Sequence, residues 1–197
     1  MIKKYKIKKF RPINKGFTLI ETLVAISIFT MSILALLSLL AQGISDTNYA
    51  KKKIIAAYLA QEGVEYIRNM RDTFVLYDPI DSQNGWNGFS NKLISNSCQN
   101  NNGCYFDDQN LDYTAQDRPM VLGLAVTACG ASCPPLLYDS SLGKYGYTMG
   151  VNPGFTRKIA ISQISSNEIK IFSTVYWTQG SGNYSLVFSE SLFNWIE

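Results

Sequence analysis

The apolar segment that begins at Phe17 contains one ionisable side chain, Glu21, and no further charged residue occurs before Asp46. About 20 apolar residues are enough for a helix to cross a bilayer, and this segment has that length. A carboxylate at the centre of such a helix costs roughly 2.5–3.5 kcal/mol on insertion scales. We therefore expect Glu21 to have a partner that offsets this cost.

A cation at similar depth is available only if the chain is cut after Gly16, which would leave a new α-amino group on Phe17. The amine and Glu21 cannot meet within one helix, because four residues advance a helix by about 6 Å. They are better placed to pair between neighbouring chains that are offset along their axes. That geometry describes a staggered filament.

This N-terminal pattern resembles the processing and assembly motif of type IV prepilins and type II secretion pseudopilins. The resemblance covers roughly residues 15–45. It rests on a basic leader (residues 1–16) that ends in Gly16, on the sequence Phe17-Thr18-Leu19-Ile20-Glu21, and on the long apolar segment that follows.

The resemblance implies that a prepilin peptidase in the membrane cleaves between Gly16 and Phe17 and methylates the Phe17 amine. It also implies that Glu21 serves filament assembly by pairing with that amine on a neighbouring subunit. The implied partners are other pilin subunits, in a homo- or hetero-filament, together with the prepilin peptidase and an inner-membrane assembly platform.

Two simpler interpretations of the N-terminus stay open. A conventional secretory signal has an apolar stretch of about 7–15 residues and a small-residue cleavage site, which Ala41-Gln42-Gly43 could imitate. The apolar run here is longer than that, and an acid interrupts it. A plain membrane anchor would tolerate Glu21 because charges near helix ends cost less than central ones.

The net charge changes when the leader is set aside. The chain has 18 Lys and Arg against 15 Asp and Glu, and seven of the 18 lie in the leader: Lys3, Lys4, Lys6, Lys8, Lys9, Arg11 and Lys15. Their removal leaves 11 basic against 15 acidic side chains, so nucleic acid is not an expected partner. A basic flank ahead of an apolar helix favours a cytoplasmic N-terminus and a globular domain outside. We expect a single-pass membrane protein that later joins an extracellular or periplasmic filament.

The chain contains no histidine. This removes the usual general base, the commonest metal ligand and every Ser-His or Cys-His nucleophile. We therefore expect no enzymatic activity, no cofactor and no metal site.

Four cysteines lie in the part expected outside the cytoplasm, where thiols can oxidise: Cys98, Cys104, Cys129 and Cys133. Three disulfide connectivities are possible. We favour Cys98 with Cys104 and Cys129 with Cys133, because each pair closes a short loop rich in turn-forming residues. A four-thiolate zinc site is the alternative, although its pairs would be spaced more widely than the usual knuckle.

The acidic segment Asp107–Asp112 offers oxygens at alternate positions, as a calcium loop does. Counted from Asp108, however, the positions that a hand-type loop gives to glycine and glutamate hold Tyr113 and Pro119. A solvated loop is the favoured interpretation, and calcium binding stays open.

Arg157 and Lys158, beside Phe155 and Tyr147, could contact DNA through charge and stacking. Strand alternation would place the two cations on opposite faces of a sheet, which argues against a shared site. The aromatic residues are better interpreted as core.

A long helix is expected over residues 17–72, because no proline occurs between Pro12 and Pro79. Residues 17–44 would form its transmembrane and filament-core half, and residues 45–72 its amphipathic half. Apolar residues recur there at helical spacing: Ile55, Leu59, Tyr66, Ile67, Met70 and Phe74. Gly63 weakens this helix unless close packing requires the missing side chain.

Charged residues cover the remaining surface of the amphipathic half. Arg68 is spaced to pair with Glu65 on one side and with Asp72 on the other. Such pairs add only a few tenths of a kcal/mol each. We therefore expect packing of the apolar stripe to matter more than these ion pairs.

Residues 73–197 should form the globular domain. Its first part, 73–154, is rich in turn-forming residues and is predicted to consist mainly of loops. Its second part, 155–197, alternates apolar and polar residues in three runs separated by Ser165-Ser166-Asn167 and by residues 179–183, which predicts an antiparallel meander over the helix stripe. The fold class is α+β, and with the resemblance it implies the type IV pilin fold: a long N-terminal helix packed against a C-terminal antiparallel sheet.

We interpret the chain as a structural subunit of a type IV pilus or a type II secretion-like filament. The helix stretch Leu59–Arg68 resembles that of minor subunits, so a minor pilin or pseudopilin is favoured. The alternative is a monomeric, membrane-anchored surface binding module that does not polymerise.

Overall fold

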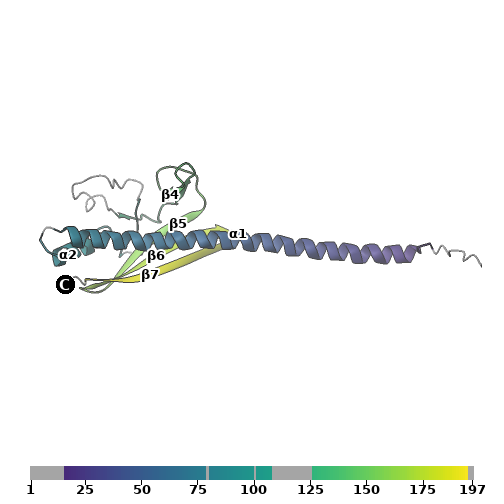
Figure 1. The fold of residues 1–197 in the computed structure, drawn as a ribbon, viewed down its shortest axis with the longest axis horizontal. Coiled ribbons are helices and arrows are strands. Elements are labelled where there is room, and N and C mark those ends of the chain that lie inside the picture. The colour runs from purple at the N-terminus through teal and green to yellow at the C-terminus, as the bar shows by residue number, and fades with distance from the viewer. Residues whose placement is uncertain (1–15, 79, 100, 108–125, 195–197) are drawn as a thin grey trace, which may run out of the picture. The chain divides into compact units, whose positions relative to one another are not determined.

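A computed structural model describes residues 16–78, 80–99, 101–107 and 126–194 of the chain. Its long N-terminal helix is followed by an antiparallel sheet, so the chain is α+β, consistent with the type IV pilin fold (Figure 1). The elements are α1 (Leu19–Tyr77), α2 (Ser82–Ser95), β1 (Cys104–Tyr105), β2 (Thr127–Ala128), β3 (Leu137–Asp139), β4 (Lys144–Gly146), β5 (Phe155–Ser165), β6 (Glu168–Gln179) and β7 (Gly182–Phe193).

The chain divides into two compact units, Met1–Thr47 and Asn48–Glu197, and α1 contributes to both. In the first unit, every described residue from Gly16 to Thr47 is exposed. The described residues include one helix that is long and apolar enough to cross a membrane, judged by length and composition, and its apolar window lies in this region. The second unit contains the buried core.

The helix α1 extends five residues beyond the expected end at residue 72. The added turn carries Val75, which is buried in the core, and Phe74, which packs against that core. Pro79 follows in the sequence, and a residue before proline disfavours helical backbone, so Asp78 is a natural stop. Burial of this last turn, invisible in the local sequence, accounts for the difference.

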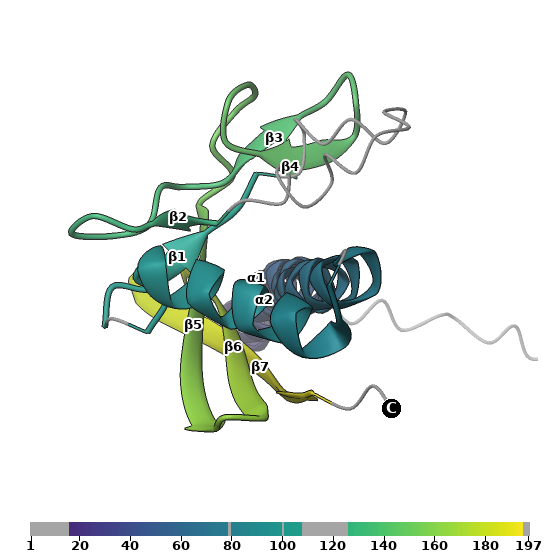
Figure 2. The same ribbon diagram turned by 90° about the vertical axis from the view of Figure 1, so that its left-hand side faces the viewer.

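The C-terminal part of the chain forms the predicted meander. Strands β5, β6 and β7 pair antiparallel, with Ile159 opposite Ser173 and Ser173 opposite Phe188. The sheet is larger than predicted, because β1 and β2 extend it beyond β5 to give the order β2-β1-β5-β6-β7. A separate two-stranded sheet, β3-β4, lies on the opposite side of α1 from β7 (Figure 2).

The apolar stripe of α1 packs against this sheet in two clusters. The first gathers Tyr66, Ile67 and Met70 of α1 with residues of α2, β5, β6 and β7. The second gathers Ala56, Leu59 and Ala60 with Phe155, Val175 and Trp177. The predicted stripe is therefore the face that the core buries.

The helix α2 corrects the expectation that residues 73–154 are mainly loops. Asp81 caps its N-terminus, because the Asn84 amide donates to Asp81 Oδ1 at 2.6 Å. Its buried Trp86, Phe89 and Leu93 recur at helical spacing, which is the signal that the Ser, Asn and Gly residues between them obscure. Tertiary burial offsets the low helix propensity of this segment.

Two disulfides join the loop-rich part. Cys98, just beyond α2, is bonded to Cys104 of β1, and Cys129 is bonded to Cys133. This is the connectivity that the short spacings favour over a four-thiolate zinc site. Cys98 and Cys104 are fully buried, so their bridge fixes α2 to the sheet from within the core.

Gly63 lies where α1 packs directly against β5 and β6. A Cβ atom at this position would lie 2.3 Å from Ser173 Oγ and 2.9 Å from Ile159 Cδ1. Real Cβ atoms do not approach other atoms so closely, so the glycine is required by packing rather than merely tolerated.

We predict that Gly63→Ala destabilises the second unit, Asn48–Glu197, by about 1–2 kcal/mol. Overpacking at so short a distance should cost about 2–3 kcal/mol, and alanine regains roughly 1 kcal/mol of helix propensity. Urea unfolding of the detergent-solubilised chain, followed by tryptophan fluorescence, measures the change. The double variant Gly63→Ala/Ser173→Ala removes the nearest clashing atom and should recover part of the loss. A Gly63→Ala chain as stable as the unmodified one would show that the contact is not restrictive.

Candidate functional site

The N-terminal motif sits at the start of α1. Thr18 precedes the first helical residue, and its hydroxyl accepts a hydrogen bond from the Glu21 amide at 3.3 Å. The Thr18 carbonyl accepts the Thr22 amide at 3.2 Å. Thr18 is therefore the N-cap, and Glu21 lies at the third helical position. The spacing Thr-x-x-Glu ahead of an apolar run is a helix-start signal that locates this cap from sequence, and it adds Thr18 to the residues of the motif.

The Glu21 carboxylate is left available. In the part of the chain that the structure describes, no cation or hydrogen-bond donor contacts its side-chain oxygens. The Phe17 side chain, four residues earlier, is 77% exposed. The helix dipole stabilises a negative charge in the first turn by typically about 0.3–1 kcal/mol. This is less than the free-energy cost of placing a carboxylate in the hydrocarbon of a membrane.

The helix that follows Glu21 carries mostly apolar residues within the first unit, and no charged residue occurs between Glu21 and Asp46. Its exposed residues include Leu23, Ile26, Phe29, Leu34 and Leu37. A helix of this kind is buried in a membrane or among other chains.

Four hydroxyl groups on this segment donate to backbone carbonyls of the same helix. Thr22 donates to the Leu19 carbonyl at 2.9 Å, and Ser27 donates to the Leu23 carbonyl at 2.8 Å. Thr30 and Ser32 bond carbonyls of the preceding turn in the same way. Because these polar groups already have partners, they cost little in an apolar environment. Glu21 differs from them because it carries a charge and has no side-chain partner among the described residues.

An ion pair between a buried arginine and a half-exposed glutamate joins the sheet to α1 in the second unit. The Arg157 side chain is 2% exposed, and its Nη1 donates to Glu62 Oε2 at 2.8 Å. Its guanidinium carbon lies 3.9 Å from the centroid of the Phe106 ring. Burial raises the pKa of the neighbouring Tyr147 hydroxyl, an effect that Arg157 partly opposes. Arg157 is therefore buried on the core face of β5, and the half-exposed Glu62 is its ion-pair partner.

A second, more exposed cluster joins α1 to β7. Arg68 Nε donates to Glu190 Oε1 at 3.1 Å, and Arg68 Nη1 donates to both carboxylate oxygens of Glu65 at 2.6 Å. The hydrogen bond to Glu190 raises the pKa of the Arg68 guanidinium above its ordinary value. The predicted pair with Glu65 is confirmed. The expected pair with Asp72 is wrong, because Asp72 bonds to Arg71 and a strand distant in sequence supplies Glu190.

The structure describes only some of the residues considered above for metal binding and DNA contact. Among the described residues, no group of three or more His, Cys, Asp or Glu could hold a metal ion. Of the acidic segment proposed for calcium, only Asp107 is described, and residues 108–112 lie outside the described part, as do leader residues 1–15. Lys158 is part-exposed while Arg157 is buried, so the two cations do not share one surface.

Comparison with protein families identifies the N-terminal segment. Residues 11–41 match the family model of the prokaryotic N-terminal methylation motif, which is the signature of type IV prepilin-like proteins. The matched range contains Gly16, Phe17 and Glu21. Comparisons with curated proteins and with solved structures give no match. The motif thus supports a type IV pilin-like or pseudopilin subunit, a class whose role is structural, and it is consistent with a membrane-anchored single-pass protein.

We predict that Glu62→Ala lowers the free energy of unfolding of the globular unit by about 3 kcal/mol, because it leaves the buried Arg157 guanidinium without its carboxylate. Glu65→Ala is the matched control, since it removes an exposed acid from the same helix and should cost less than about 1 kcal/mol. Denaturant unfolding of both variants tests the difference. Equal losses would mean that burial does not strengthen the Arg157 pair.

Proposed function

We propose that this chain is a subunit of a type IV pilus or a type II secretion-like filament that assembles through α1 after cleavage between Gly16 and Phe17. One observation carries the proposal: among the described residues no cation contacts the Glu21 carboxylate, which lies in the first turn of α1 on a helical segment whose described residues are all exposed. The match to the methylation motif over residues 11–41 supports the processing step that would create such a cation.

Cleavage changes the electrostatics at the start of the helix. A cut after Gly16 removes the leader and places an α-amino group, methylated but still cationic, on Phe17. Thr18 caps the helix, so this amine stands just outside the first turn while Glu21 lies inside it. The separation of about 6 Å along one axis favours pairing of Glu21 with the amine of a neighbour displaced by the same distance.

Apolar contact and the ion pair have separate roles in this assembly. Burial of large exposed side chains between neighbouring helices contributes roughly 25 cal/mol per Å² and supplies most of the cohesion. Apolar contact is non-directional, so it does not fix how far one helix slides along another. The pair between Glu21 and the Phe17 amine fixes that register, because leaving either charge unpaired in an apolar environment is costly.

Within this class, we place the chain among the minor pilins or pseudopilins, on the resemblance of Leu59–Arg68 to minor subunits. The leader would lie in the cytoplasm and the globular unit outside, since a basic flank sets that orientation. The prepilin peptidase and an inner-membrane assembly platform are the further partners. A monomeric membrane-anchored module would share the anchor but would stay with the cells when surface filaments are sheared off.

We expect the mature chain to begin at N-methylated Phe17. Intact-mass measurement of the protein from its native membrane should give residues 17–197 with one added methyl group. A chain that begins after Ala41-Gln42-Gly43 would indicate a conventional signal peptide, and retention of residues 1–16 would indicate a plain anchor. Either result excludes the proposed processing.

We expect Glu21→Ala to leave membrane insertion and cleavage intact and to abolish incorporation into filaments, because the neighbour's amine loses its counter-charge. Immunoblots of membranes and of the sheared filament fraction separate these steps. Ser27→Ala is the matched control, since it removes from the same helix a hydroxyl group that donates to the Leu23 carbonyl of its own chain. Incorporation of Glu21→Ala at the level of the control would remove this account of Glu21.

A further inference from the structure

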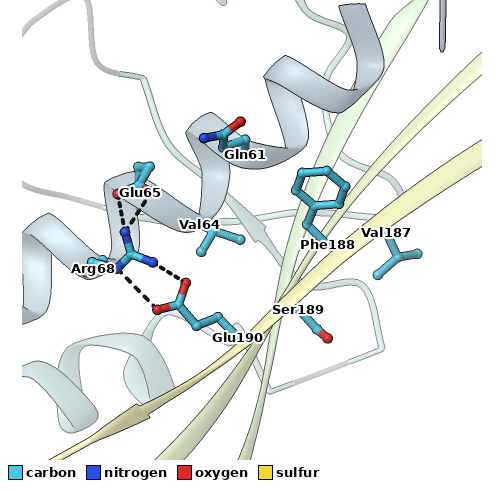
Figure 3. A pocket seen from close by; sticks show the side chains of 8 residues that line it. All are labelled: Gln61, Val64, Glu65, Arg68, Val187, Phe188, Ser189 and Glu190. Atoms are coloured by element: carbon cyan, nitrogen blue, oxygen red, sulfur yellow. Dashed lines mark hydrogen bonds and ion pairs between the residues drawn. The ribbon is translucent and has the colours of Figure 1, made fainter. Parts of the chain in front are cut away.

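A groove runs between α1 and the outer strand β7 in the second unit. Eight residues line it: Gln61, Val64, Glu65 and Arg68 of α1, and Val187, Phe188, Ser189 and Glu190 of β7 (Figure 3). Its volume is about 500 Å³. Among the described strands β7 is at the edge of the sheet, so no further strand in that part of the chain pairs with it beside Phe188.

The groove combines an apolar floor with a polar rim. Val64 is 6% exposed at its floor, and Phe188 is 38% exposed. Gln61 stands on one rim, and the ion pairs of Arg68 with Glu65 and Glu190 close one end (Figure 3). Such a site suits an aromatic side chain with a polar tip, because the ring takes the apolar floor and the hydroxyl finds acceptors at the rim.

The same helix carries a side chain of that description. Tyr58 is 70% exposed, and Ile54, one turn earlier, is 57% exposed. Folding of the globular unit does not bury either of them. Large apolar side chains left exposed next to each other mark a contact surface.

We propose that the groove binds Tyr58 of a second copy of this chain in the filament. The proposal rests on the proposed function, because pairing of Glu21 with the neighbour's Phe17 amine offsets parallel helices by four residues, about 6 Å. Residue 58 of that neighbour then stands at the axial level of residue 62, beside the stretch from Gln61 to Arg68 that lines the groove. The contact requires that copies of this chain be neighbours in the filament.

The test uses two cysteine variants of the full chain with different tags, expressed together in the native host. One carries Tyr58→Cys and the other Gln61→Cys, both at exposed positions outside the core. The structure shows no free cysteine among the described residues, because the four native ones form disulfides, so a short bismaleimide reacts at the introduced thiols. A cross-linked dimer that carries both tags can form only between copies.

We expect the two-tag dimer in the sheared filament fraction and its loss when Gln61→Cys is replaced by Leu142→Cys. Leu142 is 61% exposed but lies between β3 and β4, on the other side of α1 from β7 (Figure 2). Filaments that form without the two-tag dimer would overturn the groove contact and leave the proposed function standing. Cross-linking only to a different protein would overturn it as well. Absence of filaments from the unmodified chain would overturn both proposals.

A second pair of variants measures the contribution of the ring itself. Tyr58→Ala should reduce filament yield several-fold relative to Leu76→Ala, which truncates another exposed residue of α1 outside the groove. The melting temperature of both variants should match that of the unmodified chain, because neither side chain belongs to the core. Equal filament yields from the two variants would contradict the docking of Tyr58.

Discussion

Glu21 needs a cation that no described residue places beside it, and this requirement links the N-terminal motif to the proposed assembly. The cap at Thr18 fixes the helix start, so the carboxylate lies in the first turn and the terminus created by cleavage lies just outside it. In the proposed filament, the pair closes between two displaced helices. The same charge that makes the anchor costly in lipid therefore favours a defined register in the polymer.

In the second unit, the C-terminal half of α1 packs against a sheet. Gly63 permits the close approach, the Arg157–Glu62 pair spans the contact, and the Cys98–Cys104 bridge fixes α2 beside it. These features leave one side of the helix packed and the other free, with Tyr58 exposed. The globular unit can therefore present α1 side chains to neighbours without losing its own core.

The sequence predicts those features whose cause is local. Glu21 stands out because no charge surrounds it, and the meander from Phe155 to Phe193 follows from strict alternation and two turn signals. The features that were not predicted from the sequence depend on residues that are distant in the chain. The true second partner of Arg68, Glu190, is 122 positions away, so helical spacing pointed to Asp72 instead. From sequence, Gly63 is expected to weaken the helix, and only its contact with Ser173 shows that close packing requires it. The segment of α2 is expected to be a loop, and only the burial of its three large apolar residues explains why it is helical.

The central claim is that the Glu21 carboxylate contacts the Phe17 amine of another subunit. Solid-state NMR on filaments grown from two pools tests it most directly, one pool labelled with ¹⁵N at phenylalanine and the other with ¹³C at the glutamate carboxyl carbon. We predict a ¹⁵N–¹³C dipolar coupling between the amine and the carboxyl carbon, as expected for an ion pair with N···O within about 4 Å. Intact mixed filaments that lack this coupling would contradict the account.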